Sequence, residues 1–217
     1  PLRHVSVWDG YQTYGSGDMV TSTFDGFLTP LQGPIDAQVT FIALDGDAGA
    51  AKSDSVRFGA TILSNALNPA DDSGNSTITR AGVAIADRTP AIANTLGTDI
   101  DTYNVGSLIA NGQTSATAEF TGVPGEENYA VLTGFQTRLY APEMSVTLAV
   151  EDLNGGAAVP GDILEYTATI KNAASALDKA VKVSFTNGIP ANTTYVAGTL
   201  NLVTSPPGAP AAGMLTD

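Results

Sequence analysis

Aspartates gathered in loops are the residues of this chain best suited to chemistry. They stand in segments rich in Gly, Asn and Ser, such as "LDGDAG", "PADDSGNS" and "TDIDTYN". Ca²⁺ takes about six to eight oxygen ligands, and Asp and Asn side chains with loop carbonyls supply such ligands. We therefore consider calcium as the cofactor of these loops; the candidate metal ligands are Asp45, Asp47, Asp54, Asp72, Asp99 and Asp101.

The spacing of these aspartates does not match an EF-hand. Asp45 and Asp47 begin like a calcium loop, but Gly49 stands where the next Asp or Asn belongs, and no Glu closes the loop. The alternative interpretation is structural, because Asp and Asn side chains also close Asx-turns in loops without any metal.

Catalytic residues are harder to find. His4 is the single histidine, so any Ser-His-Asp arrangement has to use it. A glycosidase needs a pair of carboxylates, and nothing in the sequence singles out a pair. We predict that the chain is not an enzyme. Trp8, Tyr11 and Tyr14 lie close together and suit stacking on a sugar ring, although ordinary core packing is the alternative.

Composition narrows the classes of partner. The 217 residues include 22 acidic and 9 basic side chains, which gives a net charge of −13. A field of this sign repels phosphate backbones, so we expect no nucleic-acid partner. The chain has no Cys, and it has no apolar run of the length that a membrane span needs. We also expect it to be a piece of a longer precursor.

Two-residue alternation dominates the chain, and no stretch keeps a helical period. This pattern predicts an all-β fold, with a jelly-roll-like β-sandwich over 1–142 and a partial immunoglobulin-like β-sandwich over 143–217. Pro142 marks the boundary, because a fresh alternating strand follows it.

Three predicted strands show what the alternation implies. In the longest, one face is expected to hold Tyr129, Val131, Thr133, Phe135, Thr137 and Leu139. In "LEYTATIK", the inward residues are Leu164, Tyr166, Ala168 and Ile170. In "KAVKVSF", they are Val181, Val183 and Phe185.

The segment "PGDILEYTATIKNAASALDKAVKVSFTNGIPANTTYVAGTL" resembles the conserved-repeat family of bacterial surface proteins, domain of unknown function eleven. The segments "PLRHVSVWDGYQ", "SDSVRFGATILSNALNPADDSGNSTI" and "NGQTSATAEFT" are similar to the β-domain that precedes such repeats. The resemblance implies export to the bacterial cell surface and a non-catalytic structural or adhesive role. Its implied partners are neighbouring repeats or subunits of one assembly, with a surface glycan or protein receptor. The alternative is a carbohydrate- or calcium-dependent ligand-binding module.

Overall fold

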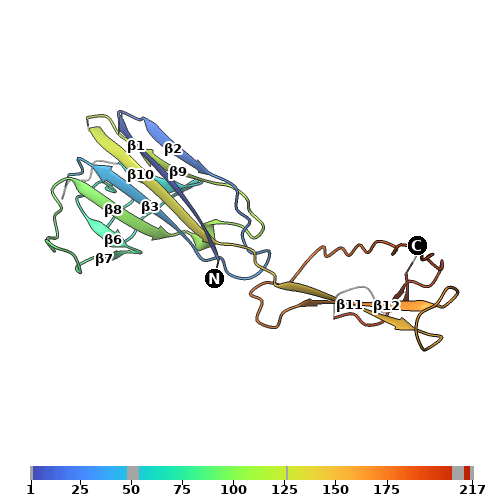
Figure 1. Cartoon of the computed structure of the whole chain (residues 1–217). Helices are drawn as coiled ribbons and strands as arrows, with labels where there is room; N and C mark the ends of the chain where they lie inside the picture. The colour runs from blue at the N-terminus through green and yellow to red at the C-terminus, as the bar shows by residue number, and fades with distance from the viewer. Residues whose placement is uncertain (1, 48–53, 126, 207–212, 216–217) are drawn as a thin grey trace. The chain divides into compact units, whose positions relative to one another are not determined.

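The computed structural model describes residues 2–47, 54–125, 127–206 and 213–215, and these residues form an all-β structure (Figure 1). By its contacts the chain divides into two compact units, Pro1–Ala180 and Val181–Asp217. The domain boundary expected at 142 stays a prediction. None of the described residues belongs to a helix long and apolar enough to cross a membrane.

The first unit contains a sandwich of two antiparallel-rich sheets. One sheet has the order β1-β10-β3-β8-β6-β7 and the other β2-β9-β4-β5. Within them, β1-β10-β3-β8 facing β2-β9-β4-β5 is the strand order of a jelly roll, as the sequence predicts. The strand bounds are β1 Arg3–Gly15, β2 Met19–Phe24, β3 Ala37–Leu44, β4 Ser55–Phe58, β5 Thr61–Ile62, β6 Ile78–Arg80, β7 Val83–Ala84, β8 Thr98–Asn104, β9 Ala116–Thr121 and β10 Glu127–Arg138, with a 3₁₀ turn at Gly106–Leu108.

The core lies between these two sheets and comes from the inward half of each alternating strand. Every second residue of β3 is buried, at 0–5% exposure, while its neighbours are only half-buried. Phe135 of β10 lies at the centre, with its ring 5.1–5.7 Å from the rings of Phe24, Phe27 and Phe58. This packing fixes the ends of β3, β8 and β10, from which the candidate site is built.

The face predicted for the longest strand is wrong in its first part. Thr133, Phe135 and Thr137 of β10 are buried as expected, but Tyr129 and Val131 are not. The pairing of β10 with β3 shifts register between Ala130 and Leu132. A bulge of this kind inserts one residue and moves all residues before it to the opposite face. It therefore turns Asn128 and Ala130 inward.

After the sandwich the chain forms a hairpin, β11 (Met144–Asp152) with β12 (Leu164–Asn172), in a two-stranded antiparallel sheet of its own. Asp178, in the chain after β12, binds the end of β10 and the segment that follows it. Its carboxylate accepts hydrogen bonds from the Arg138 guanidinium and the Ala141 amide, both at 2.9 Å. The hairpin itself remains largely exposed along both strands.

The second unit contains only two short described strands, β13 (Asn201–Leu202) and β14 (Gly213–Met214). The strand predicted over "KAVKVSF" is wrong, since 181–190 is irregular. Val181, Val183 and Phe185 are 40–53% exposed. Lys182 has a φ of 52°, a left-handed conformation that a continuous strand does not accommodate.

Candidate metal centre

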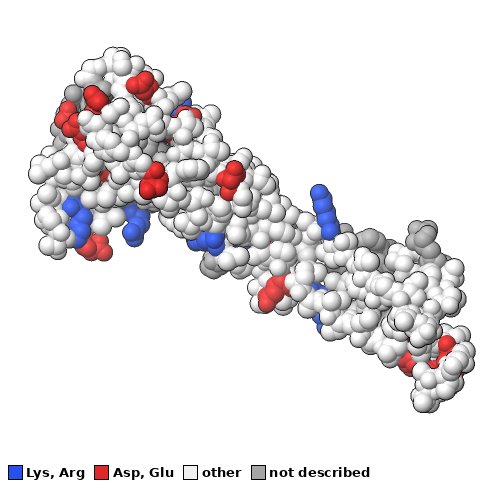
Figure 2. All heavy atoms as spheres, turned by 45° about the horizontal axis from the view of Figure 1, so that its top comes forward, with Lys and Arg blue, Asp and Glu red and all other residues white. Residues whose placement is uncertain are grey.

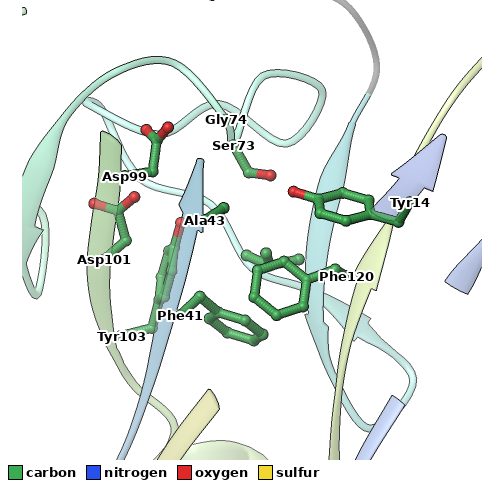
Figure 3. A pocket seen from close by; sticks show the side chains of 10 residues that line it. Tyr14, Phe41, Ala43, Ser73, Gly74, Asp99, Asp101, Tyr103 and Phe120 are labelled. Carbon is green, nitrogen blue, oxygen red and sulfur yellow. The ribbon is translucent and has the colours of Figure 1, made fainter. Parts of the chain in front are cut away.

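Strand β8 places two carboxylates inside the sandwich. Asp99, Asp101 and Tyr103 alternate toward the interior, at 3–5% exposure, while the residues between them are half-buried. Tyr103 packs edge-on against Phe41 of β3. The inward face of β8 therefore changes from aromatic to acidic toward its beginning (Figure 3).

The loop between β5 and β6 covers this acidic end and caps two carboxylates with successive amides. Asp54 forms an isolated bridge with Asp72, and its Oδ2 accepts bonds from the Ser73 hydroxyl at 2.7 Å and the Gly74 amide at 2.6 Å. Asp99 Oδ1 accepts from the amides of Asn75 and Thr77, both at 3.0 Å. The backbone amides of two successive residues therefore bind the two carboxylates: Gly74 binds Asp54, and Asn75 binds Asp99.

Each of these carboxylates keeps a second oxygen without a partner. Asp54 Oδ1 and Asp99 Oδ2 are buried and accept no hydrogen bond. Asn128, at the start of β10, is 1% exposed and has neither amide atom bonded. Buried polar groups without partners are rare because each costs about 1–3 kcal/mol, more when charged. These three side chains, together with the buried and unbonded Oδ1 of Asp72 next to Asp54, indicate a site for a ligand at this end of the sandwich.

Two glycines show how closely these groups approach. A Cβ on Gly74 would lie 3.1 Å from Asp54 Oδ2 and 3.4 Å from Asn128 Oδ1. A Cβ on Gly46 would overlap Asp99 Oδ2 and come within 2.5 Å of the Gly74 carbonyl oxygen. Oxygens of Asp54 and Asn128 therefore lie beside the Cα of Gly74, and Asp99 Oδ2 lies with the Gly74 carbonyl oxygen beside Gly46. Glycine at both positions leaves these groups that space.

The electrostatics of the centre are those of crowded, buried acids. Burial raises the pKa of Asp99 to about 7, and the charges of Asp101 and Asp54 add to that effect against the hydrogen bonds from Thr77 and Asn75. Burial raises the pKa of Asp72 as well, with further contributions from Asp54 and Asp71. A positive ion among these groups would offset both the burial and the repulsion.

Asp101 has a different environment. Burial raises its pKa to about 6, but hydrogen bonds from Thr79 and Asn68 oppose the rise. The Thr79 hydroxyl donates to Asp101 Oδ1 at 2.6 Å, and the Asn68 amide donates to both Thr79 Oγ1 and the Tyr103 hydroxyl at 3.1 Å. Asp101 is therefore held by a closed polar network and is a weaker candidate for binding an ion.

The structure thus divides the predicted ligands. It brings Asp54, Asp72 and Asp99 to one end of the sandwich, with Asp101 beside them. Asp45 and Asp47 precede the same region but are exposed, and Asp45 occupies a turn with φ 73°. Sequence reasoning missed Asn128, because an amide inside a strand carries no loop signature. No group of three or more His, Asp or Glu side chains stands ready to hold a metal in the described part of the chain; the converging set here joins carboxylates to an amide.

A small cavity reaches this centre. Its volume is about 10 Å³, and its lining includes Gly74 and Asp99 at the polar end with Tyr14 and Phe120 at the other. Figure 3 shows the Tyr14 ring entering from the opposite side, with its hydroxyl directed toward Ser73. Space of this size suits one water molecule or ion and excludes an organic substrate.

The aromatic residues considered for sugar stacking do not form one platform. Tyr14 is buried against Phe120, with ring centroids 5.2 Å apart. Tyr11 stacks on Tyr129 at 5.0 Å, and the Trp8 indole donates to the Thr23 carbonyl at 2.9 Å. Three separate environments replace the expected cluster.

His4 has no carboxylate partner among the hydrogen bonds and ion pairs of the described residues. Its Nε2 lies 2.6 Å from the Ser6 hydroxyl, and its ring packs on Phe27. The arrangement lacks the third member of a Ser-His-Asp relay.

The surface carries the same acidic bias. Figure 2 shows Asp and Glu side chains gathered at one end of the sandwich.

No protein-family model, curated protein or solved structure matches the chain.

Proposed function

We propose that the chain is a non-catalytic structural or adhesive module of an exported bacterial cell-surface protein. The observation that carries this proposal is the β11–β12 hairpin, one face of which is apolar along its central part and is exposed. An exposed apolar face of this kind is typical of a surface that binds another protein.

The pairing register defines that face. Val146 lies opposite Ile170, Leu148 opposite Ala168 and Val150 opposite Tyr166. The five larger side chains of this set are 39–58% exposed. The other face pairs Ser145 with Lys171, Thr147 with Thr169, Ala149 with Thr167 and Glu151 with Glu165, so it is polar apart from Ala149.

The hairpin also leaves its hydrogen-bonding edges open. It forms a sheet of two strands, and no third strand pairs with either edge among the described residues. Open edges next to an apolar face suit strand addition by a neighbouring β-module. We propose that the occupant is a neighbouring repeat or subunit of the same surface assembly.

The cavities support a role without catalysis. Beside the small buried cavity, a shallow pocket of about 230 Å³ is lined by Phe58, Gly59, Leu108, Gln113, Ser115, Ala116 and Thr117. This lining has no His, Asp, Glu or Lys side chain, so its Ser115 and Thr117 hydroxyls have no general base in the pocket to activate them.

Self-association tests the proposal directly. Sedimentation velocity over a range of concentrations should show association of the native chain, and Leu148→Ser on the apolar face should weaken it. Thr147→Ser, on the polar face of the same strand, is the matched control and should associate like the native chain. Equal association of the two variants would contradict the proposed face.

A second candidate function is a calcium-dependent ligand-binding module, favoured by the unpartnered buried oxygens of Asp54, Asp99 and Asn128. Binding to a glycan array that disappears with EDTA would favour this alternative. Binding that is insensitive to EDTA would argue against it.

A further inference from the structure

Three buried side chains from distant parts of the chain lie against the same loop, and each has an oxygen without a hydrogen-bond partner. Asp54 precedes β4, Asp99 lies in β8 and Asn128 in β10, and they are 1%, 3% and 1% exposed. Oxygens of Asp54 and Asn128 lie beside the Cα of Gly74, and Asp99 Oδ2 lies with the Gly74 carbonyl oxygen beside Gly46. We propose that Asp54, Asp99 and Asn128, with the Gly74 carbonyl, bind one Ca²⁺ ion that fastens the loop over 72–77 to the sandwich. This proposal stands independently of the proposed adhesive function.

Charge is the first argument for a cation. Two carboxylates buried this deeply are costly without a positive partner. The ion pairs between described residues join Arg3 to Asp36 and Arg138 to Asp178, and neither touches this centre. The hydrogen bonds from Ser73, Gly74, Asn75 and Thr77 use one oxygen of each carboxylate and leave the other for a ligand.

Asn128 is the second, independent argument. It is uncharged, so its position cannot be explained as part of a merely acidic patch. A Cβ atom on residue 74 would lie 3.4 Å from Asn128 Oδ1 and 3.1 Å from Asp54 Oδ2, so the two side chains meet beside this residue. Neither amide atom of Asn128 has a hydrogen-bond partner. An amide oxygen beside carboxylates and a backbone carbonyl is a typical set of calcium ligands.

The donor set also selects among cations. All the converging atoms are oxygens, and the single histidine contacts Ser6 and Phe27 instead. Zn²⁺ and Cu²⁺ prefer nitrogen and sulfur ligands, whereas Ca²⁺ prefers oxygen. Mg²⁺ demands near-ideal octahedral geometry and dehydrates reluctantly, so it is seldom held by an irregular set of protein oxygens. Calcium tolerates the irregular arrangement found here.

The main experiment compares two Asp→Asn variants from the same end of the sandwich. Thermal unfolding of the full chain is recorded in EDTA, then in excess Ca²⁺ or Mg²⁺. Calcium should raise the midpoint of the native chain, since a ligand that binds only the folded state stabilises it. Asp54→Asn should bind Ca²⁺ about tenfold or more weakly, because affinity follows ligand charge. Asp71→Asn removes the same charge from an exposed position and should respond like the native chain.

Two further measurements keep the test decisive if Asp54→Asn fails to fold. Asn128→Asp adds a charged ligand and should bind Ca²⁺ more tightly than the native chain does. Tb³⁺, a luminescent substitute for Ca²⁺, should be sensitised by Tyr14, which lines the same cavity as Asp99 and Gly74. Tyr14→Phe should reduce that emission while leaving the Ca²⁺-induced stabilisation in place.

Three results would overturn the proposal. The first is an equal calcium response in Asp54→Asn and Asp71→Asn, which would indicate diffuse attraction to an acidic surface. The second is an unchanged affinity in Asn128→Asp. The third is the absence of any calcium effect on the native chain, which would mean that water or a shared proton satisfies these oxygens.

Discussion

The sandwich and the β11–β12 hairpin are built from the same alternating pattern and reach opposite states of burial. In β3, Ala37, Val39, Phe41 and Ala43 are at most 5% exposed. In the hairpin, Val146, Leu148 and Val150 alternate in the same way and are 51–58% exposed. The difference is the second sheet, which covers β3 and has no counterpart over the hairpin among the described residues. Alternation thus determines which face is apolar, but only another layer buries it.

The largest expected effect in this comparison comes from truncating an aromatic core residue. Phe135→Ala removes the ring at the centre of the sandwich and should lower the free energy of unfolding by about 3–5 kcal/mol. Phe185→Ala removes the same ring from an irregular, 47% exposed position and should change it by less than about 0.5 kcal/mol. Urea denaturation followed by circular dichroism measures both. Similar losses in the two variants would break the comparison.

The next effect is a pH dependence of the unfolding free energy, which we expect in the sandwich because it contains the buried acids with raised pKa values. Without metal, folded Asp99 has a pKa of about 7, against an ordinary value of 3.8. The folded state therefore holds a proton that the unfolded state releases. The stabilisation of the folded state by this proton is complete below about pH 4 and is lost as the pH rises through about 7. In EDTA, we expect the sandwich to lose on the order of 2 kcal/mol between about pH 5 and about pH 8.

Asp99→Asn tests this dependence, since an amide cannot titrate. The variant should keep more of its unfolding free energy at about pH 8 than the native chain does, and Asp101, whose pKa is about 6, should account for most of the remaining slope. Asp71→Asn, from the exposed part of the loop, should retain the native pH profile. A native-like pH profile in Asp99→Asn would show that the Asp99 carboxyl group does not cause the pH dependence of stability.

Much of the sandwich could be predicted because its strands are regular. The alternation of Ala116, Ala118 and Phe120 in β9 gives the inward face directly, and all three are buried. The bulge in β10 could not be predicted, because a change of register depends on the partner strand. The strand expected at Val181–Phe185 failed for a related reason. Its pattern suits a strand, but the described residues offer it no sheet to join.

The candidate site shows the same limit. Loop composition indicated Asp54, Asp72, Asp99 and Asp101, and the structure brings these together. Composition could not exclude Asp45 and Asp47, which are exposed, because burial depends on tertiary packing. Asn128 turns inward only because the bulge reverses the first part of β10. Long-range pairing, which no local pattern encodes, therefore completes the site.

A smaller effect is expected where the sandwich meets the hairpin. Asp178 is 9% exposed and binds both Arg138 and the Ala141 amide. Asp178→Ala leaves two half-buried donors without an acceptor and should cost about 1–3 kcal/mol, confined to this junction. Hydrogen exchange should accelerate at Ala141, while the amides of β3 keep their protection. Loss of protection throughout β3 would mean that the junction and the sandwich unfold as one.

The smallest effect is expected on the hairpin's apolar face. In a dilute monomer, Leu148→Ala removes a side chain that is already 51% exposed, so the unfolding free energy should change by less than about 0.5 kcal/mol. Thr147→Ala, on the polar face, is its control. If a neighbouring module covers the apolar face, the cost of Leu148→Ala should grow with protein concentration while that of Thr147→Ala stays constant. A loss above about 1.5 kcal/mol at the lowest concentration would show that Leu148 is buried within the monomer, and the contrast with β3 would fail.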